Sequence, residues 1–566
     1  MGPAEYAKLR VQKVHNATDF AVASQSLHSA RLAAEAYKKS KNIIDAFVVM
    51  SFALAVERPQ STGLGGGGFL LFRHGQNGNI MALDFRETAP RKATKNMYII
   101  DGKLREDLSR EGVLSSGVPG IVAGVLQAHM LFGETPIKKL LQPVVDFAEK
   151  GFEVYPELAY AIEVSAKELI KDPSAAKIFF KEGKPLKAGE LLVRKDLAKT
   201  IGMIAKKGKR GFYSGEIAKK IVEDQVKRGG LISRRDLSRY QVKMRNPVKV
   251  YRGEYQIYSM PPPSSGGTGV IAAINMLSDM EAPKAKDSTM EAHMMATTLQ
   301  KVFADRAEHM GDSDYVRVPY RKLSSKRYAK QFVSSLDLKS RTSSKDISPD
   351  LWKKIEPDEK MPESSETTHF SMMDKKGNMI SSTQTINGYF GAKYMVPGTG
   401  IVMNNQMNDF SIAVGQPNLF KSVGSEANAV RALKRPLSSM SPTLVLHKWM
   451  PKLALGTPSG TRIISCVINV LYQNLYKDKD LYESVSALRF HHQWYPDEIR
   501  VEPPGFDPQT KAGLQKLGYK LNEKDLGCKI SAVERLEDKT LRAVSDPRGF
   551  GFPAGVGEVR VAEVKK

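Results

Sequence analysis

The segment from Thr367 to Thr385 constrains the fold of this chain more than any other stretch. Two strand-like runs, TTHFSMMD and MISSTQT, are separated by the turn sequence KKGN. This turn suits a three-residue hairpin loop, in which a type I turn is followed by Gly377 in the left-handed conformation. Such a loop pairs Asp374 with Asn378, and counting back along both strands brings Thr367 next to Thr385. The sequence therefore predicts two threonines side by side at the open end of a hairpin.

The stretch that enters this hairpin has a different character. Residues 336–366 are rich in Ser, Lys, Asp, Glu and Pro and show little periodicity, so we expect a polar, mobile connection. A flexible segment that leads into a strand starting at a threonine draws attention to that threonine. Threonines are nevertheless common on half-exposed strands for structural reasons alone. The hairpin by itself does not make Thr367 functional.

Helical and strand patterns alternate along the rest of the chain. Helices are predicted over about 21–39 and 43–57, the second capped by Asn42 and with Asp45 in its first turn. A hairpin over FLLFR and IMALDFR follows and ends at Arg86. The remaining patterns are mostly helical over 117–228, strand-rich over VKVYRGEYQIYSM, turn-like over PPPSSGG, and helical again up to residue 334.

A glycine run over residues 63–68 invites comparison with phosphate-binding loops. A Walker motif requires Lys-Ser/Thr after its last glycine, whereas Phe-Leu-Leu follows here. A dinucleotide fingerprint opens a helix, and a strand is predicted instead. The run therefore favours a loop that lets the backbone approach another element closely.

Composition excludes several classes of function. The net charge of +24 comes from scattered Lys and Arg residues without a long basic tract, which favours a basic solvated surface over nucleic-acid binding. The longest apolar run, residues 46–56, is shorter than the roughly 20 residues that span a bilayer and is predicted to be a buried helix. The ten histidines form no H-E-x-x-H motif, so neither a catalytic metal nor a cofactor is expected.

The chain has only two cysteines, Cys466 and Cys528. This number excludes a disulfide-rich framework and a zinc ribbon. One bridge remains possible, but two buried free thiols are favoured. The first twenty residues contain no apolar signal core, so the protein is either cytoplasmic or has lost a signal segment.

Strings along nearly the whole chain resemble the γ-glutamyltransferase family, in that family's order. They are LGGGGFLLFR, LDFRETAPRKAT, SGVPGIVAG, YSMPPPSSGGTG, TTHFSMMDKKGNMISSTQTIN, NNQMNDFS, KRPLSSMSPTLVL and LRFHHQWYPDEIR, within about residues 20–550. The resemblance implies an N-terminal nucleophile hydrolase of the α/β (α+β) class, a four-layer αββα sandwich. It also implies that the precursor cleaves itself between Glu366 and Thr367. Residues 1–366 would form a large subunit and residues 367–566 a small subunit, which remain together as a heterodimer.

The implied chemistry uses Thr367 as both nucleophile and base. A threonine hydroxyl is a weak nucleophile and needs an adjacent base. Cleavage would free the α-amino group of Thr367, and an α-amino group with an ordinary pKa of about 7.7–8.0 exchanges protons readily near neutrality. The hydroxyl would attack a γ-glutamyl amide such as glutathione, and water or the amine of an amino acid or peptide would resolve the ester. Thr385 matches the second threonine, which supports the nucleophile.

The resemblance also implies a site for the glutamyl head, which carries a carboxylate and an ammonium group. Arg86 matches the carboxylate-binding arginine, whose planar fork can donate two parallel hydrogen bonds. Without the resemblance, an ion pair with Glu87 or Asp84 would be favoured. Asp409 matches the residue that pairs with the α-amino group. The further implied contacts are Asn387, Gln406, Ser438 and Ser439.

The sequence departs from the family at four positions. Ser459 replaces the first of two glycines after a proline, in the pair Ser459–Gly460 whose backbone N–H groups are expected to form the oxyanion hole. A serine would cost energy there if the position needs a positive φ, and weaker catalysis would follow. The other three departures are Phe420 for a lid tyrosine of bacterial relatives, Asn408 for an acid, and Glu366 for an amide side chain before the cleavage site.

The sequence is therefore compatible with three functions. The leading one is a γ-glutamyl hydrolase and transferase, with a periplasmic or extracellular location because the family is usually exported. A related amidase acting on poly-γ-glutamate or on acyl-lactam side chains is an alternative, because a basic surface suits a polyanion, although a lid over residues 409–435 favours a small substrate. An uncleaved, non-catalytic basic binding protein is the alternative from another class. The acceptor and the oligomeric state beyond the subunit pair stay open.

Overall fold

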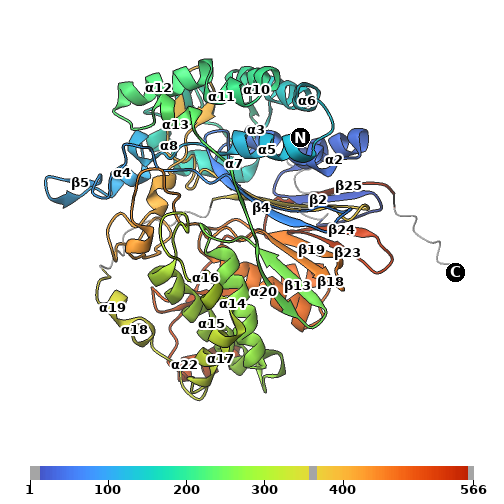
Figure 1. Ribbon diagram of the computed structural model, residues 1–566, viewed down its shortest axis with the longest axis vertical. Coiled ribbons are helices and arrows are strands. Elements are labelled where there is room, and N and C mark those ends of the chain that lie inside the picture. Colours follow the sequence, from blue (N-terminus) through green and yellow to red (C-terminus); the bar gives the residue numbers. More distant parts are fainter. Residues whose placement is uncertain (1–12, 356–365, 559–566) are drawn as a thin grey trace.

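Two large sheets lie face to face between two helical layers in the computed structural model, which describes residues 13–355 and 366–558 (Figure 1). The layers therefore follow the order αββα, and the predicted four-layer sandwich is confirmed. Both large sheets are antiparallel throughout.

The first sheet carries the predicted threonine hairpin at its centre. Its order is β11 (Lys243–Arg245), β4 (Ile80–Asp84), β3 (Gly67–Arg73), β15 (Met379–Thr385), β14 (Thr368–Asp374), β2 (Phe20–Ser24) and β25 (Phe552–Val556). The second sheet has the order β1 (Val14–Ala17), β24 (Leu541–Ser545), β23 (Ser531–Arg535), β19 (Met450–Gly456), β18 (Thr443–His447), β13 (Tyr255–Ser259) and β12 (Val248–Arg252). Strands β14 and β15 pack against β19 and β23 of the second sheet.

Helices cover the outer face of each sheet (Figure 1). On the first sheet pack α2 (Leu27–Ser40), α3 (Ile43–Glu57) and α5 (Ile121–Phe132), and on the second α14 (Gly266–Asp279) and α20 (Arg462–Tyr476). Farther from the sheets, α6 (Ile137–Lys150) packs against α3 and α10 (Lys195–Lys207) against α6, while α15 (Ser288–His309) and α17 (Lys326–Ser334) pack against α14. Further helices are α4 (Asp107–Arg110), α7 (Pro156–Val164), α8 (Ala166–Leu169), α9 (Pro173–Phe179), α11 (Lys209–Tyr213), α12 (Glu216–Arg228), α13 (Arg234–Ser238), α16 (Tyr320–Leu323), α21 (Leu481–Ser486) and α22 (Pro508–Lys516). A small three-stranded sheet contains β20 (Phe490–His492), β21 (Ile499–Val501) and β22 (Leu521–Glu523).

The register of the hairpin agrees with the count from the turn. Thr368 lies opposite Gln384, and the N–H of Asp374 donates to the carbonyl of Asn378 (3.1 Å). Gly377 has a φ of +82°, as the three-residue loop requires. Every residue of β14 and β15 is buried, because helices cover one face and the second sheet the other.

Local signals also predicted the second helix. The side chain of Asn42 accepts hydrogen bonds from the N–H groups of Ile44 (2.7 Å) and Asp45 (3.1 Å), so the predicted cap of α3 is confirmed. The predicted start of the first helix, at about residue 21, is wrong, because α2 begins at Leu27. Residues 20–24 form strand β2, because this fully buried segment pairs with β14 on one side and β25 on the other, and these tertiary contacts outweigh local helix preference.

The glycine run passes close to other backbone, as predicted. A Cβ added to Gly65 would lie 2.2 Å from the carbonyl oxygen of Val402, and one added to Gly66 would lie 2.1 Å from that of Thr385. Any side chain larger than hydrogen would therefore push the neighbouring chain away from the end of the hairpin. The run shapes the site and follows no phosphate-binding pattern.

The prediction of two free thiols is wrong, because Cys466 and Cys528 form a disulfide. Their Cα atoms are 6.6 Å apart although the residues are separated by 62 positions in sequence. Cys466 lies on α20 and Cys528 in the loop between β22 and β23, two segments that only the tertiary fold brings together. The composition carried no information on this distance.

The expected polar connection contains some regular structure. Helices α18 (Ser344–Ile347) and α19 (Pro349–Trp352) form within it, and Leu351 is buried. Residues 356–365 of the predicted mobile segment lie outside the described residues. Within the described part of the chain, no helix is both long and apolar enough to cross a membrane.

Candidate active site

Thr367 lies at the open end of the central hairpin, beside Thr385. Their Oγ1 atoms are 3.3 Å apart, and both residues are buried. The hydroxyl of Thr367 donates to the carbonyl oxygen of Glu366 (2.5 Å), so the hydroxyl of Thr385 is the donor between the two threonines. The N–H of Asn387 in turn donates to Thr385 Oγ1 (2.8 Å) and fixes its position. The predicted pairing of the two threonines is therefore present.

A small cavity of about 20 Å³ adjoins the two threonines and collects most of the predicted site residues. Its lining includes Arg86, Thr367, Thr385, Asn387, Gln406, Asp409, Phe420, Ser438, Ser439 and Gly460. Ser459 is next to this lining in sequence. Glu366 faces a second cavity on the other side of Thr367. Residues from several separate parts of the chain thus meet around one hydroxyl.

Arg86 and Asp409 form an ion pair inside this cavity. Arg86 Nη2 donates to Asp409 Oδ2 and to the carbonyl of Leu437 (3.2 Å). Gln406 Nε2 donates to the same carboxylate oxygen of Asp409 (2.7 Å). A buried guanidinium and a carboxylate side by side provide complementary charges for a group that carries both an anion and a cation.

The turn after β19 forms the other wall of the cavity. Ser459 has a φ of +112° and Gly460 one of +56°, so the suspected left-handed requirement at the serine is confirmed. A Cβ on Gly460 would lie 2.2 Å from the Phe420 ring, which shows how tightly the turn and this ring pack. Gln493 holds the backbone next to the ring, because its Nε2 donates to the carbonyls of Phe420 (3.1 Å) and Lys421 (3.0 Å).

A family model described as gamma-glutamyltranspeptidase matches residues 29–556. The chain belongs to the gamma-glutamyltranspeptidase family. The glutathione hydrolase proenzyme of Escherichia coli (strain K12) is 41% identical over 531 residues, which cover 93% of this chain and 90% of that protein. Both the family and this relative are named as enzymes.

Solved structures agree with the fold. The gamma-glutamyltranspeptidase of Helicobacter pylori is 39% identical with a TM-score of 0.53, over 56% of this chain and 93% of that chain. The cephalosporin acylase of Bacillus halodurans has a TM-score of 0.81 over 97% of this chain and 98% of that chain. Its identity of 21% shows a common fold only.

Arg306, near the end of α15, is a site residue of this gamma-glutamyltranspeptidase-family chain that sequence reasoning missed. It lines the cavity, and its Nε donates to Ser439 Oγ (3.3 Å) while its Nη1 donates to Ser422 Oγ (2.5 Å). Burial lowers the pKa of Arg306 to about 10, and Asp409 acts in the opposite direction. A single arginine in a long helix matches no motif, and its burial becomes visible only in the fold.

Backbone contacts hold the two serines and Asn387 in place. Ser265 donates to the carbonyl of Ser438 through both its N–H and its hydroxyl (2.8 Å each), so the PPPSSGG turn packs behind the cavity. Asn387 has a φ of +80°, and its Nδ2 donates to the carbonyl of Asn405 (3.1 Å). The lining is therefore fixed from behind before any substrate enters.

Asn408, one of the departures from the family, anchors the segment that carries Phe420. Its Oδ1 accepts from the N–H of Leu419 (2.9 Å), and its Nδ2 donates to Ser109 Oγ (2.8 Å). Leu419 directly precedes Phe420, so the amide of Asn408 connects the segment that lines the cavity to the residue before Asp409. An acid at this position would accept from Leu419 but could not also donate to the serine.

Glu366 lies on the other side of Thr367, in a cavity of about 340 Å³. Arg58 Nη2 is 3.9 Å from Glu366 Oε2, and Glu157, Tyr389 and Lys529 also line this space. Burial raises the pKa of Glu366 from 4.5 to about 7, although Arg58 works against this shift. The residue before Thr367 therefore has a pKa close to neutral pH.

Within residues 13–355 and 366–558, no group of three or more His, Cys, Asp or Glu could hold a metal ion. His369 is an example of a buried histidine with a structural role. Its ring contacts Thr383 Oγ1 (2.8 Å) and Ser371 Oγ (3.0 Å), and burial lowers its pKa to about 3. It stays neutral at physiological pH.

Proposed function

We propose that this chain is a γ-glutamyl hydrolase and transferase that cleaves itself between Glu366 and Thr367 and then uses Thr367 as its nucleophile. The observation that supports this proposal most directly is one small cavity, which is lined by both the Thr367–Thr385 pair and the Arg86–Asp409 pair. The first pair suits nucleophilic attack. The second suits the carboxylate and ammonium of a γ-glutamyl head, as in glutathione.

Self-cleavage starts from the contact between the Thr367 hydroxyl and the preceding carbonyl. Oγ1 attacks the carbonyl carbon of Glu366, the peptide C–N bond breaks, and the proton of the hydroxyl passes to the departing nitrogen. Water then hydrolyses the ester. The products are a large subunit, residues 1–366, and a small subunit, residues 367–566, whose first residue carries a free α-amino group.

The mature site runs the same chemistry on an external amide. The α-amino group of Thr367 accepts the proton from Oγ1, which attacks the γ-carbonyl of the substrate. The N–H groups of Ser459 and Gly460 stabilise the oxyanion, and Thr385 orients the nucleophile. The leaving amine takes the proton, and water or an acceptor amine then attacks the γ-glutamyl ester at Thr367.

Selectivity for a γ-glutamyl head depends on the charges of Arg86 and Asp409. The substrate carboxylate takes the place of Asp409 on Arg86, with Ser438, Ser439 and Arg306 nearby, and the substrate ammonium pairs with Asp409. Asn387 and Gln406 complete the contacts to the head. An acyl-lactam side chain without an ammonium group would leave the largely shielded carboxylate of Asp409 without a cationic partner, which is costly. A cavity closed by Phe420 admits a terminal γ-glutamyl head more readily than an internal unit of poly-γ-glutamate.

The experiment combines denaturing electrophoresis with release of p-nitroaniline from γ-glutamyl-p-nitroanilide. We expect two fragments and steady release from the wild type, and a single inactive chain from Thr367→Ala. Thr540→Ala, a change in the distant β23–β24 turn, is the matched control and should be cleaved. Turnover by an uncleaved Thr367→Ala chain would refute the proposal. Breakdown of capsule polymer in preference to the anilide would favour the poly-γ-glutamate alternative.

We also propose a periplasmic or extracellular location. The Cys466–Cys528 disulfide supports it, because such bonds persist mainly in oxidising compartments. Fractionation of cells that express the native gene tests this point. Recovery of the cleaved protein only in the cytoplasmic fraction would contradict it.

A further inference from the structure

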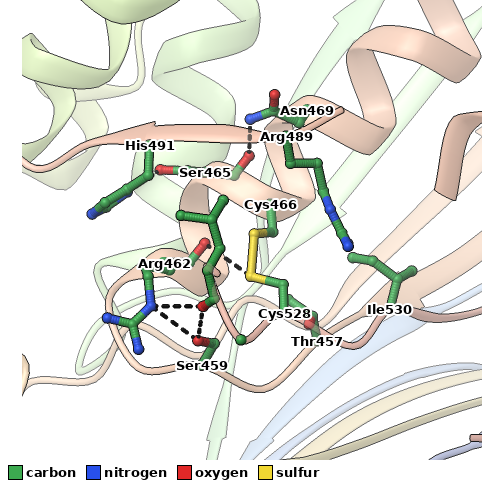
Figure 2. The surroundings of a disulfide bond; sticks show 12 residues. Thr457, Ser459, Arg462, Ser465, Cys466, Asn469, Arg489, His491, Cys528 and Ile530 are labelled. Atoms are coloured by element: carbon green, nitrogen blue, oxygen red, sulfur yellow. Dashed lines mark hydrogen bonds between the residues drawn. A yellow bond between two sulfur atoms is a disulfide. The ribbon is translucent and has the colours of Figure 1, made fainter. Parts of the chain in front are cut away.

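The turn that carries Ser459 is held from behind by one carbonyl group. The hydroxyl of Ser459 and the Nε of Arg462 (2.7 Å) both donate to the carbonyl oxygen of Leu526. Arg462 Nε also donates to Ser459 Oγ (3.0 Å), so the three groups form a closed triangle (Figure 2). All three residues are buried.

Ser459 needs such support because its backbone is strained. A φ of +112° is unfavourable for a residue with a Cβ, and glycine adopts it at little cost. The contact with Leu526 holds the serine in this conformation and so directs its N–H. A glycine would need no such anchor, since its conformation there carries no steric penalty.

Leu526 lies in a loop without regular structure, residues 524–530, between β22 and β23. Two sets of hydrogen bonds hold the loop: Arg500 contacts the carbonyls of residues 524 and 525, and the N–H of Lys529 donates to Thr457 Oγ1 (2.9 Å). Between them, the disulfide joins Cys528 to Cys466 on α20.

The disulfide connects the two segments that form this triangle, the loop with Leu526 and the helix that begins at Arg462. Cys528 is two residues after Leu526, and Cys466 is one helical turn beyond Arg462 on the same face of α20. Both sulfur-bearing residues are fully buried beside the triangle (Figure 2). The covalent bond therefore fixes the distance between the loop that offers the Leu526 carbonyl and the helix that begins at the turn.

We propose that the Cys466–Cys528 disulfide is a positioning device for the oxyanion turn, which holds the Leu526 carbonyl where it keeps Ser459 in its left-handed conformation. This inference rests on the proposed function, in which the N–H groups of Ser459 and Gly460 bind the oxyanion. It explains how a serine is accommodated at a position where glycine would be easier. The bond acts on the reaction through Leu526 and Ser459 and contacts no reacting atom.

The test is a double-mutant cycle that joins Cys466→Ala/Cys528→Ala with Ser459→Gly. Loss of one oxyanion donor typically lowers kcat by about 10²–10³-fold, so a displaced donor should cost roughly 10-fold. We expect removal of the disulfide to lower kcat by about 10-fold in the Ser459 background, with an unchanged KM for the γ-glutamyl donor. In the Ser459→Gly background the same removal should lower kcat by less than about twofold, because the glycine needs no anchor.

Equal losses of kcat in both backgrounds, or no loss in either, would overturn the proposal, since a merely structural bond would not distinguish serine from glycine. Asn42→Ala, which weakens the distant cap of α3, controls for general destabilisation and should leave kcat unchanged. If the cysteine-free chain does not fold, the folded wild type and Ser459→Gly are each reduced with tris(2-carboxyethyl)phosphine, and the same two ratios are compared.

Hydrogen exchange separates this inference from the proposed function. Removal of the disulfide should speed amide exchange over residues 457–461 in the Ser459 background, whether or not the protein turns over a γ-glutamyl amide. An inactive wild type with faster exchange in the cysteine-free variant would refute the function and keep the positioning role. If the wild type is active but removal of the disulfide changes neither the amide exchange of residues 457–461 nor kcat, only the positioning role is refuted.

Discussion

Glu366→Gln should stabilise the segment before the cleavage site at alkaline pH and have a much smaller effect at pH 5. Burial raises the pKa of Glu366 from 4.5 to about 7, with Arg58 acting in the opposite direction, and its side chain is 14% exposed. A carboxyl group with a raised pKa favours the folded state fully below its unfolded pKa and loses that contribution as the pH rises through 7. Keeping the ionised group buried then costs about 1 kcal/mol at pH 5 and about 3 kcal/mol at pH 8.

The measurement compares Glu366 with Glu366→Gln in the uncleavable Thr367→Ala chain. Amide hydrogen exchange of peptides that span residue 366 reports the free energy with which this segment leaves its cavity. Intrinsic exchange rates cancel in the ratio between the two chains at one pH. Between pH 5 and pH 8 the exchange ratio of the two chains should change by roughly 70-fold, with its midpoint near pH 7.

A constant ratio from pH 5 to pH 8 would refute the reasoning, because it would place the pKa of Glu366 at its ordinary value. A ratio that changes in the opposite direction would show that Arg58 outweighs burial. Glu537→Gln, in the turn between β23 and β24 and far from the cavity, is the matched control. It should show no pH-dependent ratio at residue 366.

Two further changes test the site, and a third tests the stability of the fold away from it. Arg306→Gln removes the donor to Ser439, and the loss of one charge-assisted hydrogen bond of about 1.5 kcal/mol predicts a KM for the γ-glutamyl donor that is raised about 10-fold, with a smaller change in kcat, in steady-state assays. Gly460→Ala would put a Cβ 2.2 Å from the Phe420 ring at a φ of +56°, so we expect a loss of kcat and a lower Tm, and wild-type values for both would contradict the packing. Asn42→Ala removes two cap hydrogen bonds and should lower stability by about 1 kcal/mol in urea unfolding without changing kcat.

Sequence rules that depend on neighbouring residues correctly predicted the hairpin register and the helix cap. The loop length and Gly377 set the register of the hairpin, so the pairing of Thr367 with Thr385 followed from the sequence. The cap of α3 depends on residues within one turn of Asn42 and was equally accessible. Strand β2 was mistaken for the start of a helix because its state depends on two partner strands that are distant in sequence.

The site itself combines segments that no local rule connects. Family resemblance named most of the lining, yet Arg306 reaches it from a helix without any motif, and its role depends on where α15 packs. The disulfide was missed for the same reason, since its two halves are 62 residues apart and only the tertiary fold sets their distance. Sequence did identify the weak position, because a serine where glycine is usual pointed to a positive φ, and Ser459 has one.

The buried carboxyl of Glu87 should make binding of the γ-glutamyl donor depend on pH. Its carboxyl is fully buried, 3.8 Å from Arg86 Nη1, and burial raises its pKa to about 8 while Arg86 acts in the opposite direction. Below pH 8 the protonated acid leaves the charge of Arg86 to Asp409 and to a substrate carboxylate. As the pH rises through 8, ionised Glu87 competes for that charge, so the KM for the γ-glutamyl donor should rise. Glu87→Gln should remove this rise in KM while the effect of the Thr367 amino group on kcat persists. A KM that rises equally in both chains would assign the titration to another group.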